Sequence, residues 1–133
     1  MKSSLQTLQR IQKFNIDEQR KILAELQTNE EKLQSGLERL NTEYEREKEF
    51  ASAHPGTGDF GAYTKRYLQY REAFERQLAA VRAEIEKVRD KIADMFKEQK
   101  TLRLLTTIVK SAAKRKTTPK SRKPLMKSAR MPI

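Results

Sequence analysis

Residues 51–61 read ASAHPGTGDFG and separate two long stretches that are rich in helix-forming residues. The His-Pro-Gly triplet and two further glycines are strong helix breakers, whereas residues 5–50 hold one glycine and no proline. Asp59 is well placed to cap the helix that follows the loop. We therefore predict two helices, at about 4–50 and about 62–109, joined by a short loop at 51–61.

Apolar residues of the first predicted helix recur at spacings of three and four, which indicates a heptad seam, the stripe that packs against a partner helix. Glu30 interrupts this seam. Its members are Leu23, Leu26, Leu33, Leu37, Leu40 and Tyr44. Nearer the N-terminus the apolar residues do not keep one register, so we expect less regular packing there.

The second predicted helix carries a longer seam, which only Gln99 and Thr106 break. Its members are Tyr63, Tyr67, Tyr70, Phe74, Leu78, Val81, Ile85, Val88, Ile92, Met95, Leu102 and Val109. Two spacings of four follow each other between Tyr70 and Leu78, and such a stutter locally relaxes a supercoil.

Neither helix is expected to be stable alone, because isolated helices depend on packing of their apolar stripe. A short loop that joins two stripes of matching length favours an antiparallel pair. The predicted fold is therefore all-α, a long antiparallel two-helix coiled-coil hairpin over residues 1–109 with a basic tail at 110–133.

The composition excludes several classes of protein. Only 36% of the residues are hydrophobic and 35% are charged, with a mean hydropathy of −0.89. The chain has no cysteine and one histidine, His54, so we expect neither a disulfide nor a thiolate or histidine-paired metal site. No catalytic constellation is recognisable, and we expect a soluble, intracellular, non-enzymatic protein without a cofactor.

The tail at 110–133 has nine basic residues, three prolines and no acidic residue. The tail therefore carries most of the net charge of the chain, which is +11. We expect this tail to be disordered in isolation. It could bind nucleic acid through charge, lie on an anionic membrane surface, or simply keep the chain soluble. The densest basic residues are Lys114, Arg115, Lys116, Lys120, Arg122 and Lys123.

Four of the nine aromatic residues fall in the stretch AYTKRYLQYREAF, residues 62–74. Aromatic residues at helical spacing are usually core. Tyr63 and Tyr70, however, fall off the register that the seam keeps from Leu78 onward. We therefore expect part of this stripe, with Tyr44 opposite, to be exposed as a binding surface, and plain core packing is the alternative.

Several of these segments together resemble the flagellar FliJ family. They are the opening MKSSLQTLQRIQKFNIDEQRK, the segment YEREKEF before the loop, the aromatic stretch YTKRYLQYREAFERQL after it, and the segment FKEQKTLRLL. The resemblance covers residues 1 to about 109 and is nearest to alphaproteobacterial members. The opening and the aromatic stretch after the loop are its most specific parts.

The resemblance implies a non-enzymatic antiparallel coiled coil of the flagellar type III export apparatus, similar to the central stalk of rotary ATPases. The implied partners are the hexameric export ATPase, FliI, the export-gate membrane protein, FlhA, and export chaperones. The implied location is the cytoplasmic face of the inner membrane, at the flagellar basal body.

The resemblance also implies two sets of interface residues. The gate-binding set lies toward the loop and comprises Leu37, Leu40, Tyr44, Tyr67, Tyr70 and Phe74. The ATPase-binding set lies at the helix termini and comprises Leu5, Leu8, Ile11, Phe14, Leu102, Leu104, Leu105 and Val109.

The basic, proline-bearing tail departs from the charged helical segment that commonly ends the family. Two alternatives therefore stay open beside the flagellar one. One is the equivalent stalk of a virulence type III secretion system. The other is a coiled coil that associates with nucleic acid or a membrane through its tail.

Overall fold

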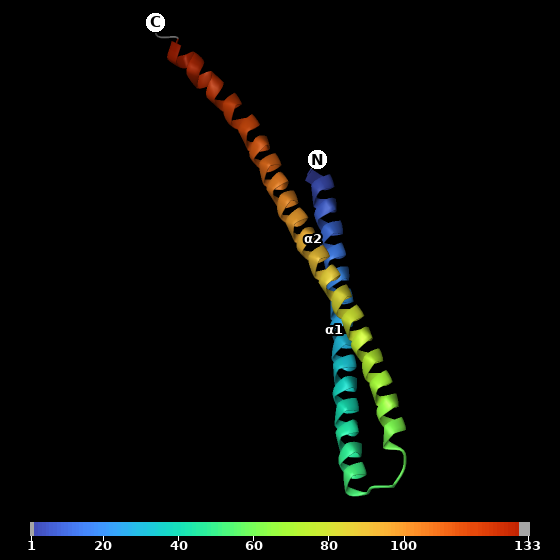
Figure 1. Cartoon of the computed structure of the whole chain (residues 1–133). Coiled ribbons are helices and arrows are strands. Elements are labelled where there is room, and N and C mark those ends of the chain that lie inside the picture. Colours follow the sequence, from blue (N-terminus) through green and yellow to red (C-terminus); the bar gives the residue numbers. More distant parts are fainter. Residues whose placement is uncertain (1, 131–133) are drawn as a thin grey trace. The chain divides into compact units, whose positions relative to one another are not determined.

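The computed structural model describes the backbone of residues 2–130 and the side chains of residues 3–114. It contains two helices, α1 at Lys2–Ala53 and α2 at Phe60–Arg130, and no strand among the described residues (Figure 1). The chain divides into two units. We call residues 18–92 the hairpin unit, and residues 1–17 with 93–133 the terminal unit. The predicted all-α antiparallel pair of helices is confirmed.

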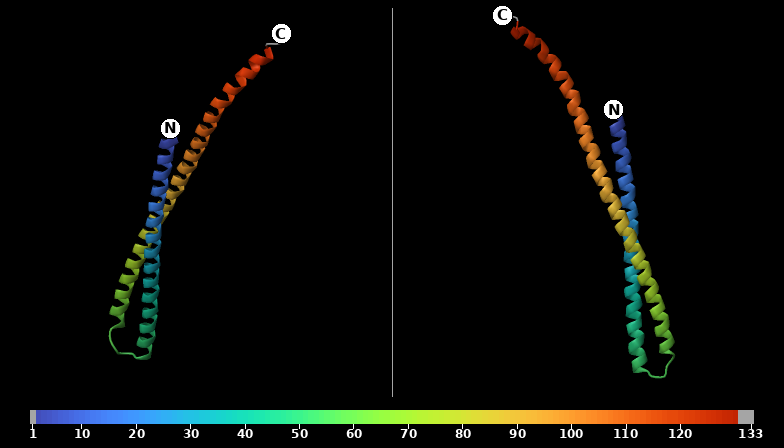
Figure 2. Two further views of the ribbon diagram at one scale, coloured as in Figure 1. Left: turned by 180° about the vertical axis from the view of Figure 1, so that it is seen from behind. Right: turned by 45° about the horizontal axis from the view of Figure 1, so that its top comes forward.

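In the hairpin unit the loop reverses the chain, and the adjoining parts of α1 and α2 run side by side in opposite directions (Figure 2). Gly56 and Gly58 have φ angles of 88° and 80°, values that favour glycine. The Asp59 carboxylate accepts a hydrogen bond from the backbone N–H of Ala62 at 3.0 Å, so Asp59 caps α2 as predicted.

The core of the hairpin unit is a narrow stripe between the two helices. The side chains of Tyr67, Leu78, Ile85 and Val88 are buried there. The six predicted seam residues of α1 are all half-buried, so the predicted register is confirmed. Glu30 is half-buried in the same stripe. Arg82 of the opposite helix donates hydrogen bonds to the Glu30 carboxylate at 3.1 Å and to Gln34 Oε1 at 3.1 Å.

On α2 the predicted seam is correct except at one position. Tyr70 is 61% exposed, and the half-buried residue at that level is Arg71. The stripe thus passes from Tyr67 through Arg71 to Phe74. The two consecutive spacings of four therefore join Tyr63, Tyr67 and Arg71, and not Tyr70, Phe74 and Leu78 as predicted. Tyr70 consequently lies toward solvent.

The described helix α2 continues to Arg130, although the sequence predicts its end near residue 109. Val109 marks instead the end of the packed stripe, since residues 110–114 are all exposed. In the terminal unit Gln9 lies opposite Thr106. Because the two helices are antiparallel, the first residue of α1, Lys2, lies level with residues 110–114 of α2, so α1 has no residue that could cover α2 further on. The side chains of residues 115–133 lie outside the described part, and the predicted disorder of the tail in isolation stays a prediction.

Gly36 makes room for an aromatic ring. A Cβ atom at this position would lie 2.8 Å from Phe74 Cε1, closer than carbon atoms can approach. The missing side chain of Gly36 therefore lets the ring of Phe74 pack against α1.

We expect Gly36→Ala to destabilise the protein by about 1 kcal/mol, since the displaced ring outweighs the gain in helix propensity. In a Phe74→Leu background, where the ring is gone, the same change should be stabilising. Urea unfolding followed by circular dichroism measures both. A stabilising effect of Gly36→Ala with Phe74 in place would contradict this account of the packing.

Candidate functional site

Four aromatic rings cluster beside the loop in the hairpin unit. Tyr44 of α1 stacks on Tyr67 with ring centroids 3.9 Å apart, and on Phe60 and Tyr63 at 5.7 Å and 6.2 Å. Phe60 and Tyr63 are themselves 6.1 Å apart. Each aromatic pair adds about 0.5–1.5 kcal/mol beyond the area that it buries. This cluster, which we call the aromatic cluster, therefore fastens the first turns of α2 to α1.

Polar contacts lock the same rings in place. Tyr67 donates a hydrogen bond to Asn41 Oδ1 at 2.7 Å, and the Tyr44 and Thr64 hydroxyls lie 3.3 Å apart. The guanidinium of Arg71 lies 5.6 Å from the centroid of the Tyr67 ring, over its face. The buried Tyr67 is thus held from three sides.

Burial, together with the carboxylates of Glu47 and Glu43, raises the pKa of Tyr63 above its ordinary value.

Of the six residues predicted to bind the gate protein, the structure leaves only Tyr70 exposed. Tyr67 is buried, and the remaining four are half-buried seam residues: Leu37, Leu40, Tyr44 and Phe74. Three large exposed side chains of this unit were not predicted, and they are Ile22, Phe50 and Leu68. All three lie outside the predicted seam, and that position was the signal that could have found them.

The terminal unit mixes polar and apolar residues in its packed stripe. Its packed stripe includes the half-buried polar residues Gln9, Gln12, Gln99 and Thr106. Gln9 donates to Thr106 Oγ1 at 3.1 Å. Large apolar side chains of the same unit are exposed instead, and they are Leu8, Ile11, Phe14, Phe96, Leu104, Leu105 and Ile108. A contiguous exposed apolar patch is typical of a surface that a partner covers, and Leu8, Ile11 and Leu105 line one groove together.

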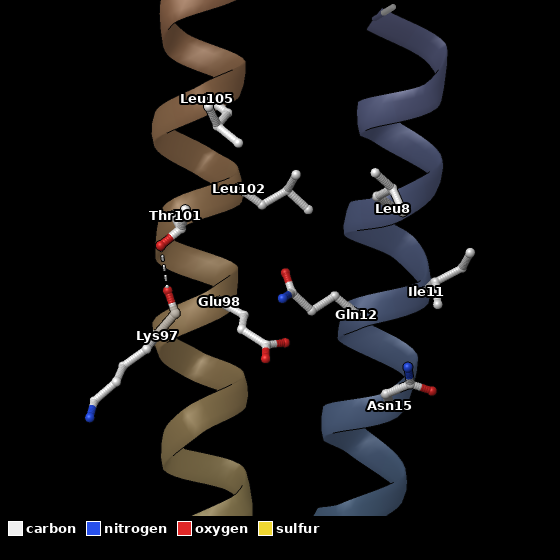
Figure 3. Close-up of a pocket in the computed structure, with 9 residues that line it drawn as sticks. All are labelled: Leu8, Ile11, Gln12, Asn15, Lys97, Glu98, Thr101, Leu102 and Leu105. Atoms are coloured by element: carbon white, nitrogen blue, oxygen red, sulfur yellow. Dashed lines mark hydrogen bonds between the residues drawn. The ribbon is translucent and has the colours of Figure 1, made fainter.

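Part of this apolar surface forms a groove of about 510 Å³ between the two helices (Figure 3). The groove is lined by Leu8, Ile11, Gln12 and Asn15 of α1 and by Lys97, Glu98, Thr101, Leu102 and Leu105 of α2. Leu102 extends toward Leu8, and Glu98 and Gln12 extend from opposite helices toward the space between them.

The groove unites four of the eight residues predicted to bind the ATPase, namely Leu8, Ile11, Leu102 and Leu105. Leu5 and Val109 are half-buried in the packed stripe, and Phe14 and Leu104 are exposed outside the groove lining. The sequence placed these residues at one end of the hairpin, but it could not tell which of them share a face.

A second face of the terminal unit is basic. In an antiparallel pair, residues that precede a packed position on each helix share one face, and residues that follow it share the opposite face. The preceding positions include the groove residues Leu8, Ile11 and Leu105. Five of the nine following positions hold exposed cations, which are Arg10, Lys13, Lys100, Arg103 and Lys110, and the other four hold Gln6, Asp17, Phe96 and Thr107. This face was not predicted, because the basicity of the chain was attributed to the tail.

Within the described part of the chain, neither helix has a stretch apolar enough to cross a membrane. The same residues contain no group of three or more carboxylate or imidazole side chains that could hold a metal ion. No family model, no curated protein and no solved structure matches the chain.

Removing one hydroxyl group distinguishes the hydrogen-bonded Tyr67 from the exposed Tyr70. Tyr67→Phe leaves Asn41 Oδ1 without its donor, so we expect the free energy of unfolding to fall by about 1 kcal/mol. Tyr70→Phe, the same chemical change three residues away, should leave it unchanged. Equal losses in urea unfolding would show that the Tyr67 hydrogen bond does not stabilise the fold.

Proposed function

We propose that this chain is a stalk and adaptor protein of the bacterial flagellar type III export apparatus. The proposal combines the resemblance to the FliJ family with the exposed apolar groove and the partly polar packed stripe of the terminal unit, and this second feature is the observation that carries it. A structural coiled coil without partners would bury its leucines and expose its glutamines. Here Gln12 is half-buried and Leu105 is exposed, and this arrangement suits a helix pair that is surrounded by another protein.

In this proposal the terminal unit enters the hexameric export ATPase ring. Six equivalent subunits would then meet a helix pair whose faces differ, with an apolar groove on one side and Arg10, Lys13, Lys100, Arg103 and Lys110 on the other. Subunits that contact different faces gain different interaction energies. A ligand with unequal affinity for two conformations shifts the population between them, so the ring would become asymmetric.

The hairpin unit would carry the second contact, to the export-gate protein. Tyr70 is an exposed aromatic residue one helical turn from Tyr67 of the aromatic cluster, and tyrosine is among the residues that most often dominate binding energy. Coupling between ring and gate would run along α1 and α2, since each contributes residues to both units. The proposed location is the cytoplasmic side of the inner membrane, at the flagellar basal body, with export chaperones as further partners.

A second candidate is favoured by the basic face. Its five cations, together with the basic tail, are suited to nucleic acid or an anionic membrane surface, where affinity falls steeply as salt rises. The stalk of a virulence type III system is a variant of the first proposal, and a neighbouring flagellar or injectisome operon separates the two.

The first proposal predicts that the full chain stimulates ATP turnover and hexamer formation by the export ATPase of the same organism at about one chain per six subunits. Lys100→Glu with Arg103→Glu should weaken this stimulation about tenfold, since each change places a carboxylate where an interface cation stood. Lys65→Glu with Arg66→Glu, which alters the net charge equally in the hairpin unit, is the control. Truncation after residue 109 shows whether the tail contributes.

Absence of stimulation by the unaltered chain would remove the stalk proposal. If the same preparation bound duplex DNA with a steep salt dependence, the second candidate would replace it.

The gate contact has its own prediction. Tyr70→Ala should weaken binding to the cytoplasmic part of the gate protein by about 2 kcal/mol, the scale of an interface hot spot, with no loss of helicity. Gln77→Ala, an exposed position one heptad further along α2, is the matched control. Calorimetric titration measures both, and equal affinities for the two variants would remove Tyr70 from the interface.

A further inference from the structure

The groove of the terminal unit has an apolar part and a polar part. Leu8, Leu102 and Leu105 form the apolar part, with Ile11 at its margin. Gln12, Asn15 and Glu98 form the polar part (Figure 3). A complementary occupant therefore needs apolar side chains toward one end and a polar group of defined chemistry toward the other.

Two observations define that polar group. Gln12 Oε1 is buried and has no hydrogen-bond donor within the described residues. Glu98 brings a carboxylate to the same end of the groove, and no ion pair of Glu98 occurs in the described part of the chain. Lys97 does not neutralise it, because its side chain extends away from the groove (Figure 3). The exposed Glu98 thus offers acceptor oxygens to a cationic donor in the groove, whereas Gln12 Oε1 is itself buried.

The shape of the groove indicates which kind of molecule supplies the cation. The lining residues stand at helical spacings, Leu8 with Ile11 on α1 and Leu102 with Leu105 on α2. Such a channel between two antiparallel helices accepts the side chains of a third helix that carries apolar residues at i, i+3 and i+7. A third helix in the groove would bury the exposed leucines. It would thus add an apolar contact to the partly polar packed stripe between α1 and α2.

We infer that the groove binds an amphipathic helix of another protein, which carries a leucine-type stripe and one Lys or Arg that reaches Glu98. A second copy of this chain is the less suitable occupant, because its groove would bring the same carboxylate to meet Glu98. The inference goes beyond the proposed function, since it defines the chemistry of the partner helix whichever protein carries it.

A labelled alanine-based peptide serves as the probe. It carries leucines at i, i+3 and i+7 and one lysine at i+10, so that all four side chains share one face. Two companion peptides replace the lysine by glutamate or the leucines by alanine. Fluorescence anisotropy with the full-length protein should show that the lysine peptide binds about tenfold more tightly than either companion.

Charge reversal on the protein sharpens the test. Glu98→Lys should invert the preference, so that the glutamate peptide binds more tightly than the lysine peptide. Glu31→Lys makes the same change at an exposed position of the hairpin unit and should leave the preference unchanged. Leu105→Ser should lower the affinity about tenfold, whereas Leu104→Ser, at the adjacent exposed residue outside the groove lining, should not. Thermal unfolding of each variant shows that it remains folded.

Three outcomes would overturn the inference. One is equal binding of the lysine and glutamate peptides. Another is concentration-dependent self-association in sedimentation that Leu105→Ser abolishes, which would make a second copy the occupant. The third is a gain in peptide affinity on deletion of residues 115–133, which would assign the groove to the chain's own tail. None of these measurements involves the export ATPase, so failure here is separate from failure of the proposed function.

Discussion

The contact between the two helices in the hairpin unit is what the rest of the structure depends on. Each helix is too polar to be stable in water by itself, and its stability comes from a stripe that includes about two residues in every seven. Leu78, Ile85 and Val88 form the most deeply buried part of this stripe. The packed stripe is narrow, so most side chains of each helix lie outside it and are accessible to other molecules.

The terminal unit uses this freedom differently from the hairpin unit. In the hairpin unit leucines and aromatic rings occupy the packed positions, and polar side chains such as Asn41 are satisfied by a hydrogen bond from the opposite helix. In the terminal unit Gln9 and Gln12 occupy equivalent positions, and Ile16 is the one deeply buried apolar residue among those described there. The terminal unit thus gives up packing energy within the chain and keeps apolar surface available for a partner.

The sequence predicted what depends on local periodicity. The breaker loop, the Asp59 cap, the antiparallel pairing and the α1 seam from Leu23 to Tyr44 follow from residue spacing alone. The place of Tyr70 in the predicted seam was wrong, whereas the expectation that Tyr70 falls off the register agrees with its exposure, because Tyr70 and Arg71 compete for one packed position. A hydrophobicity pattern favours the tyrosine. The structure favours the arginine, whose aliphatic part packs while its guanidinium lies over Tyr67 and within 3.7 Å of Glu75.

The same limit explains why the groove and the basic face were not predicted. Both require that Gln9, Gln12, Gln99 and Thr106 be recognised as packed positions, and a search for apolar residues treats them as interruptions. Once they are placed in the stripe, the spacing of four and three continues from Leu5 through Ile16 on α1 and from Met95 through Val109 on α2. The apparent irregularity of the first apolar residues then has a simple cause. Leu8, Ile11 and Phe14 are exposed, so they lie outside the packed stripe and its spacing does not include them.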